Sequence, residues 1–217
     1  MDRLNRRTWA ATAFSWLGLS LLATGCNTLA TFTYVLTGTD TEAEFKELPG
    51  KKVAIVCRPT TSLDFNNSSV ATMLAQQVGI RLQQQVKKIE IVDQRQVSDW
   101  TDENTWEDYV EIGRALNADF VIGIDLEEFN LYQGQTLYQG RANVHFAVYD
   151  TTKGKLHVWE KYLPQVVYPP TAPIPASERP EGEFRRKFVG ALAEQIAKYF
   201  HAHDSTADFA ADSTVLY

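Results

Sequence analysis

The stretch FVIGIDL, residues 120–126, decides the fold because its apolar residues alternate along the chain. Successive side chains of an extended strand point to opposite faces, so one face of this strand is wholly apolar. Four side chains form that face: Phe120, Ile122, Ile124 and Leu126. The stretch therefore predicts a strand with one face buried in the core of the domain.

The residues after this strand predict two more strands in an antiparallel meander. Gly134 marks a turn, and the alternation returns in residues 142–148. A tight connection at 150–155, which contains Gly154, leads to a third strand that begins near Leu156. We expect these three long strands to be neighbours in one sheet.

Two strand and helix units precede the meander. Residues 51–57, KKVAIVC, form a β-branched run suited to a buried strand, and residues 89–92 predict a second strand. The sequence from Thr105 to Asp108 is typical of a capping box and predicts a helix through Leu116. An earlier helix is predicted over 70–86, because an apolar residue stands at every fourth position: Val70, Leu74, Val78, Leu82 and Val86.

The C-terminal part predicts a loop, a helix and a tail. Residues 164–180 hold six prolines and predict a loop, because proline cannot donate to a helix or a sheet ladder. A last helix is expected over 181–203, with a flexible tail at 204–217. The predicted fold class is α/β (α+β), a single domain at 51–203 with the order β-α-β-α-β-β-β-α. Its mixed sheet would contain the antiparallel meander and be covered by helices mainly on one face.

The N-terminus contains a short apolar segment that ends at a cysteine. Three arginines within the first seven residues precede an apolar stretch of roughly 13 residues, too short to span a bilayer comfortably, and the run LLATGC ends at Cys26. This arrangement resembles a bacterial lipoprotein signal. The resemblance implies that residues 1–25 are removed, that the sulfur of Cys26 receives a diacylglyceryl group, and that the new amino terminus is acylated. An ordinary secretory signal and an uncleaved helix are the alternatives.

The same resemblance has consequences for location. In the lipoprotein family, Asp after the lipidated cysteine retains the protein at the inner membrane, and this chain has Asn27 there. The resemblance therefore favours the periplasmic face of the outer membrane and leaves the inner membrane as the alternative. Residues 26–50 carry little periodicity and predict a lipidated tether, with acyl chains on Cys26 as the link to the membrane.

The composition is acidic. The 217 residues carry a formal net charge of −6, and removal of residues 1–25, which hold three basic residues and one acidic residue, would change it to −8. Binding to nucleic acid depends on clustered Lys and Arg, so nucleic acid is excluded as a general partner. Arg185, Arg186 and Lys187 follow one another on a predicted helix and point in different directions, which predicts a solvated face.

Two segments carry a resemblance to envelope proteins. The passage from Val110 to Gly123, VEIGRALNADFVIG, resembles the helix-to-strand passage of the curli-secretion and TolB amino-terminal type of domain. The later pattern is similar to the lipoprotein partner of the lipopolysaccharide translocon, with Val148-Tyr149-Asp150, a Gly154-Lys155 turn, Val158-Trp159-Glu160 and a terminal helix at 191–200. These resemblances imply a subunit of an envelope biogenesis or secretion machine.

The sequence predicts no enzyme, cofactor or metal site. It contains no Gly-x-Ser-x-Gly elbow, P-loop, dinucleotide fingerprint or His-Glu-x-x-His helix. Asp125 and Glu127 fall on one face of a strand, and we expect both to be solvated. His145 and His157 lie on neighbouring predicted strands, where a half-buried polar pair is expected rather than a metal site.

Three further residues have simple interpretations. Cys57 lies inside an apolar run and is expected to be a small buried hydrophobe. His201 and His203 are two apart on the last predicted helix, so they would not share a face and would not bind a metal together.

The best surface candidate is an aromatic and proline cluster at Tyr162, Tyr168, Pro169 and Pro170, because rigid side chains of this kind suit protein recognition. Trp159 is expected in the core. The leading hypothesis is a non-catalytic, membrane-anchored lipoprotein that binds an envelope protein partner. A lipid or lipopolysaccharide carrier is one alternative and predicts an apolar groove with a cationic rim. An anchored hydrolase is the other and predicts a nucleophile and a base within hydrogen-bond reach.

Overall fold

The computed structural model describes residues 40–59, 66–154 and 156–204, with no account of the side chains of 40 and 66–68. The predicted signal peptide at 1–25, the predicted lipidation site Cys26, the first part of the predicted tether and the predicted tail after Asp204 lie outside the described residues. The strands are β1 Asp40–Thr41, β2 Lys52–Pro59, β3 Glu90–Ile91, β4 Phe120–Gln133, β5 Leu137–Asp150, β6 His157–Tyr168, β7 Ile174–Pro175 and β8 His203–Asp204. The helices are α3 Asn66–Gln85, α4 Gln94–Glu103, α5 Tyr109–Ala115, α6 Glu181–Ala197 and the 3₁₀ turn η1 Lys198–Phe200.

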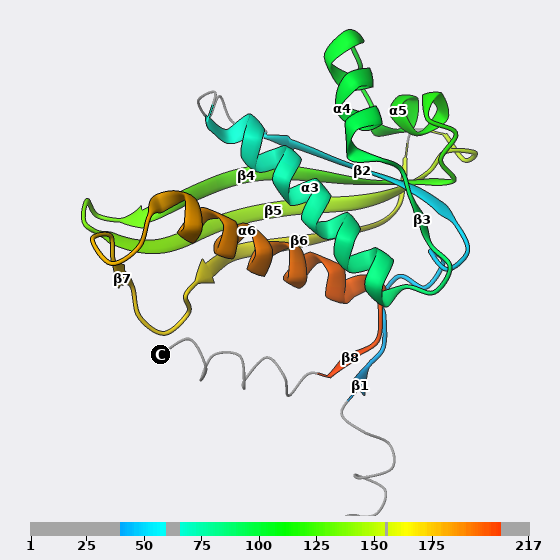
Figure 1. The fold of residues 1–217 in the computed structure, drawn as a ribbon. Coiled ribbons are helices and arrows are strands. Elements are labelled where there is room, and N and C mark those ends of the chain that lie inside the picture. Colours follow the sequence, from blue (N-terminus) through cyan, green and yellow to red (C-terminus); the bar gives the residue numbers. More distant parts are fainter. Residues whose placement is uncertain (1–39, 60–65, 155, 205–217) are drawn as a thin grey trace, which may run out of the picture.

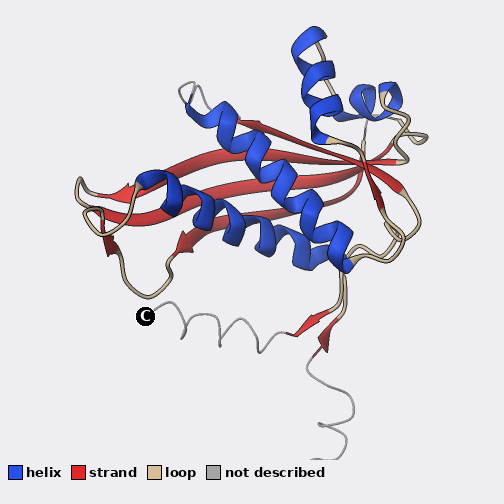
Figure 2. Ribbon diagram, viewed as in Figure 1, coloured by secondary structure: helices blue, strands red, loops and turns tan. Residues whose placement is uncertain are grey.

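One mixed sheet organises the domain, with the strand order β3-β2-β4-β5-β6 (Figures 1 and 2). β2 pairs in parallel with both β3 and β4, whereas β4, β5 and β6 form the expected antiparallel meander. β7 adds to the start of β5, opposite Leu137 and Tyr138. The predicted fold class, a mixed sheet with a meander and helices mainly on one face, is confirmed.

The inner face of the sheet is the face that α3 and α6 cross, and it holds the larger core (Figure 1). The apolar side chains of FVIGIDL lie there as predicted. Phe188 of α6 stacks on Phe129 of β4, with ring centroids 5.0 Å apart. A Cβ atom at Gly140 would lie 2.5 Å from the Phe188 ring, so this glycine allows α6 to approach the sheet closely.

The outer face is covered only in part, by α4 and α5. Val97 of α4 and Tyr109 and Ile112 of α5 pack on small residues of β2 and β4. A Cβ atom at Gly113 would lie 2.4 Å from Val121, which brings the backbone of α5 directly onto the sheet. This second, smaller core reaches β5 at Tyr149, whose ring centroid lies 5.2 Å from that of Tyr109, and it leaves the outer surface of β6 without a covering helix among the described residues.

Helix α4 was not predicted, and α5 is shorter than predicted. Val97 and Trp100 are the two large apolar residues of α4 and only Val97 is fully buried, so the apolar signal of the segment is weak, although the Asp93 carboxylate caps it by accepting from the Arg95 amide. α5 begins at Tyr109 rather than near Thr105, because Asp108 is the residue whose side chain accepts from the Glu111 amide.

The predicted loop at 164–180 is wrong in two places. β6 continues to Tyr168, and residues 174–175 form β7. β6 is the edge strand of the sheet order, and an edge strand can contain Pro164 because only one of its sides must donate to a neighbour. Proline content therefore marked an edge strand as well as a loop.

The predicted tether at 26–50 is wrong for residues 40–50. Phe45 and Leu48 are buried in the inner core, and the Phe45 ring packs against Phe120, Trp159 and Phe200. β1 pairs with β8, so the two ends of the described chain leave the domain side by side (Figure 1). Among the described residues, no helix combines the length and apolarity needed to cross a membrane.

The last helix ends earlier than predicted, with α6 stopping at Ala197 and η1 at Phe200. His201 and His203 therefore lie in extended backbone, where residues two apart point to the same side. Their rings are 6.0 Å apart, so the expectation that they would not share a face is wrong.

Candidate functional site

A row of charged and polar side chains crosses the outer face of the sheet. We call it the charge ladder; it consists of Arg58 on β2, Asp125 on β4, His145 on β5, and Glu160 and His157 on β6. The strand register creates this row, because Arg58 is directly opposite Asp125 and Asp125 is directly opposite His145. Residues far apart in sequence thus meet at one level of the sheet.

The first step of the ladder is an ion pair held between aromatic rings. Arg58 Nε donates to Asp125 Oδ1 at 3.0 Å, and Nη2 lies 3.0 Å from the same oxygen. The guanidinium group also lies 5.5 Å from the ring centroid of Trp106 and 5.2 Å from that of Tyr109. A cation over aromatic faces is attracted by their quadrupole, so Arg58 is fixed both by the carboxylate and by the rings.

Tyr109 joins this pair from α5. A Cβ atom at position 123 would lie 2.7 Å from its ring, so Gly123 provides the space in which the ring lies on β4. The hydroxyl donates to Asp125 Oδ1 at 2.7 Å. Burial, followed by the negative charge of Asp125, raises the pKa of Tyr109 well above its ordinary value. Tyr109 therefore stays a neutral donor that helps to satisfy a largely buried carboxylate.

The second step of the ladder places one imidazole between two carboxylates. His145 Nδ1 lies 3.7 Å from Asp125 Oδ2, and Nε2 lies 2.9 Å from Glu160 Oε2. The other oxygen of Glu160 lies 3.4 Å from His157 Nε2. The hydrogen bond with His145 and the charge of His157 lower the pKa of Glu160 below its ordinary value. Both nitrogens of His145 are thus directed at carboxylates.

The ladder ends at an apolar edge, which we define as Leu156, Val158 and Tyr162 around and along β6. All three are exposed, with Val158 at 39% and Tyr162 at 47%. The Tyr162 hydroxyl hydrogen-bonds Glu127 of β4, so its ring lies across the outer face. Exposed aromatic and β-branched side chains beside fixed polar groups are typical of a recognition surface.

The structure separates the residues of the predicted partner-binding surface. Tyr162 lies on the outer face, whereas Tyr168 lies on the inner side and stacks on Phe188 at 6.2 Å. Pro169 is buried and Pro170 is exposed. Of the predicted cluster, only Tyr162 belongs to the apolar edge, because the strand alternation and an irregularity near Gln165 direct Tyr168 to the opposite side.

The structure also shows where the predicted core residues Trp159 and Cys57 and the predicted histidine pair lie. Trp159 packs on the inner core, against Phe146 and Phe200. Cys57 also packs there, and burial, followed by the charge of Asp125, raises the pKa of its thiol. His145 and His157 do not form the half-buried pair that was expected; Glu160 joins them.

Asp125 was expected to be solvated, and this expectation is wrong. Its side chain is only 16% exposed and is bonded to both Arg58 and Tyr109. The ladder residues Arg58 and Glu160, and the role of Tyr109 beside them, were not predicted. Gly123, an isolated glycine inside an apolar strand, was the one sequence signal of a close approach there.

Within 40–59, 66–154 and 156–204, no group of three or more His, Cys, Asp or Glu side chains is arranged to hold a metal ion.

No family model and no curated protein matches the sequence. Among solved structures, the fold is similar to lipoprotein GNA1162 from Neisseria meningitidis, with a TM-score of 0.44, 13% identity, and coverage of 68% of this chain and 98% of that one. It is also similar to the PelC dodecamer from Paraburkholderia phytofirmans, with a TM-score of 0.39, 12% identity, and coverage of 73% of this chain and 91% of that one. A third similar structure is a minor lipoprotein from Acinetobacter baumannii, with a TM-score of 0.35, 16% identity, and coverage of 70% of this chain and 90% of that one. Structural neighbours of the domain thus include bacterial lipoproteins, and likenesses this distant carry no argument about function.

Proposed function

We propose that this protein is a non-catalytic lipoprotein of an envelope biogenesis or secretion machine, anchored through acyl chains on Cys26 at the periplasmic face of the outer membrane. It would bind a protein partner on the outer face of β4, β5 and β6. The observation that supports this proposal best is the charge ladder, which runs from beneath Trp106 and Tyr109 to β6, where no helix covers the outer face among the described residues, and ends at the apolar edge.

The surroundings of Tyr162 indicate the chemistry of the partner. Glu127 and Glu128 of β4 act on the Tyr162 hydroxyl, and Glu160 lies two residues before Tyr162 on β6. A partner segment with basic side chains beside apolar ones would complement both the carboxylates and the apolar edge. An edge strand such as β6 can also pair with an extended segment of another chain.

The contacts of His145 support binding rather than turnover. A histidine that activates a nucleophile needs one nitrogen on a hydroxyl or thiol, and here Nδ1 faces Asp125 while Nε2 faces Glu160. Cys57 packs on the inner side of the sheet, and the raised pKa of its thiol disfavours the reactive thiolate.

Site-specific photo-crosslinking tests the docking proposal. A photoreactive residue at Tyr162, in the full chain in native membranes, should form an adduct with an envelope protein that mass spectrometry identifies. The same residue at Glu178, an exposed position before α6 on another part of the surface, is the control. Adducts that do not exceed this control would contradict docking, and adducts with lipid or lipopolysaccharide would favour the carrier function instead.

The anchor has its own test. A Cys26→Ser chain should lose labelling by palmitate and should be released from the membrane fraction. Labelling that survives this substitution would overturn the lipoprotein assignment but would leave the docking face untouched.

A further inference from the structure

Helix α3 has a surface with very little charge. Arg81 is the single charged residue among its 20 residues, whereas a helix of this length with the 22% charge of the whole chain would hold about four. Helix α6 lies in the same layer, and six of its 17 residues are charged. A helix that packs with one side on a core normally carries charge on the other side, so α3 is unusual.

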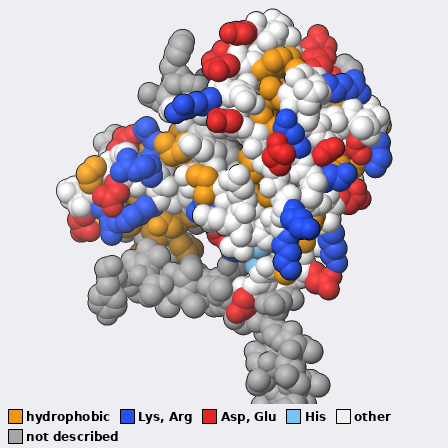
Figure 3. All heavy atoms as spheres, turned by 45° about the vertical axis from the view of Figure 1, so that its right-hand side comes forward, with side chains coloured by type: hydrophobic (Ala, Val, Ile, Leu, Met, Phe, Trp, Pro, Cys, Tyr) orange, Lys and Arg blue, Asp and Glu red, His pale blue; other side chains and the backbone are white. Residues whose placement is uncertain are grey.

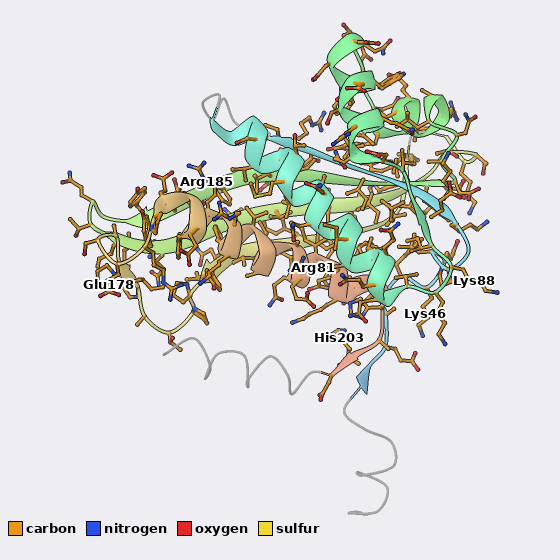
Figure 4. All side chains as sticks on the ribbon, in the orientation of Figure 1. Lys46, Arg81, Lys88, Glu178, Arg185 and His203 are labelled. Carbon is orange, nitrogen blue, oxygen red and sulfur yellow. The ribbon has the colours of Figure 1, made fainter. Side chains whose placement is uncertain are left out.

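The one charge of α3 is neutralised inside the helix layer. Arg81 Nε donates to Glu194 Oε2 of α6 at 2.7 Å, and Nη1 donates to Gln77 Oε1 at 3.0 Å. Figure 4 shows Arg81 where α3 and α6 approach each other. The outward side of α3 is therefore left without a charged side chain among its described positions.

That outward side is a continuous row. Residues three or four apart share a helix face, and four exposed side chains follow this spacing: Thr72, Gln76, Ile80 and Gln83. Ile80 is 39% exposed. α3 crosses the front of the molecule in Figure 1. Figure 3 turns this view by 45° about the vertical axis and shows uncharged side chains across its middle. Depletion of charge around an apolar residue is what distinguishes the centre of an interface from ordinary surface.

We infer that this row binds the same row of a second copy of the chain, with the two α3 helices antiparallel about a two-fold axis near Gln76. The chain carries a net charge of −6, so two copies repel each other, and an uncharged face is where that repulsion is least. In such an interface, Gln76 faces Gln76 of the second copy and Thr72 faces Ile80 of the second copy.

The side-chain chemistry of the row suits this symmetry. A two-fold interface places one patch against itself, so its residues must be self-complementary. A glutamine side chain both donates and accepts, and it can therefore pair with its own copy across the axis, which a carboxylate cannot do. The methyl group of Thr72 offers an apolar contact to Ile80 of the second copy.

Cysteine crosslinking in native membranes tests the geometry. Gln76→Cys in the full chain should give a disulfide-linked dimer on mild oxidation, because a residue at a two-fold axis meets its own copy within the 4.4–6.8 Å that a disulfide spans between Cα atoms. Gln195→Cys, the same change at an exposed position of α6, is the matched control and should remain monomeric. Equal dimer from both variants, or none from Gln76→Cys, would overturn the inference.

A charge substitution tests the energetics. Ile80→Glu should weaken self-association of the solubilised full chain by about tenfold or more in analytical ultracentrifugation, since it places a carboxylate in an uncharged interface. Gln195→Glu adds the same charge at an exposed position of α6, outside the row and outside the apolar edge, so its self-association should be unchanged. An Ile80→Glu chain that associates like the native protein would refute the α3 interface, and this result is independent of partner adducts at Tyr162.

Discussion

The inner and outer faces of one sheet use the same strands in different ways. On the inner face, β4 and β5 contribute alternate apolar side chains to a core that α3 and α6 cover (Figure 2). On the outer face, the intervening positions of the same strands hold Gly123, Asp125 and His145, and the cover by α5 stops at Tyr109. The inner face thus contributes mainly to stability. On the outer face, the polar groups lie where α5 no longer covers the sheet.

The largest effect is expected from truncation on the inner face. Phe188→Ala removes a fully buried ring that stacks on Phe129 and Tyr168, so it should lower the free energy of unfolding by about 3–5 kcal/mol. Tyr162→Ala, at the apolar edge, should cost less than about 1 kcal/mol. Urea denaturation measures both, and similar losses would erase the contrast between the faces.

A smaller loss is expected where helix α5 meets the outer face. Gly123→Ala would push a methyl group to within 2.7 Å of the Tyr109 ring, and overpacking of this kind costs about 1–3 kcal/mol. Gly182→Ala, in α6, meets only the flexible end of Arg186 at 3.7 Å and should be neutral or stabilising. Thermal melting of the two variants should therefore shift in opposite directions or by clearly different amounts.

The hydrogen bond from Tyr109 to Asp125 should contribute about 1 kcal/mol, because it satisfies a largely buried carboxylate. Tyr109→Phe removes only this donor. Tyr132→Phe removes a bond of the same length, 2.7 Å, from an exposed tyrosine to Glu181, and it should cost a few tenths of a kcal/mol. If the two variants were equally stable, Asp125 would not depend on the Tyr109 hydroxyl.

The last effect depends on pH and concerns Asp150 at the end of β5. Hydrogen bonds from the hydroxyl and the amide of Thr152 lower the pKa of Asp150 to about 2. Because the folded pKa is below the unfolded one, this carboxylate stabilises the fold above about pH 4, and the contribution is lost as the pH falls toward 2. An NMR titration should show the pKa of Asp150 rising toward its ordinary value in Thr152→Val. A pKa near 4 in the native protein would contradict the contact.

The inner face could be predicted from the sequence and the outer face could not. The alternation of residues 120–126 and the four-residue spacing of α3 report burial directly, so both elements were predicted with the correct side inward. Helix α4 has a single fully buried residue, and residues 40–50 contribute only Phe45 and Leu48 to the core. Such sparse apolar signals are too weak to distinguish an ordered segment from a tether.

The charge ladder depends on strand register, which local sequence patterns do not contain. Arg58 and Asp125 are 67 residues apart, and His145 and Glu160 are 15 apart. Their contacts follow from β2 pairing with β4 and β5 pairing with β6 at one particular register. The split between Tyr162 and Tyr168 has the same cause, because an irregularity in β6 changes which side a residue faces.

The most direct test of the docking face is the yield of the protein adduct at Tyr162 in two backgrounds, Val158→Glu and Ile80→Glu. Both substitutions add one carboxylate at a side chain that is 39% exposed, one in the apolar edge four residues before Tyr162 and one on α3. Docking on the outer face predicts that the adduct is lost in Val158→Glu and kept in Ile80→Glu. An adduct that persists in Val158→Glu at the native yield would contradict it.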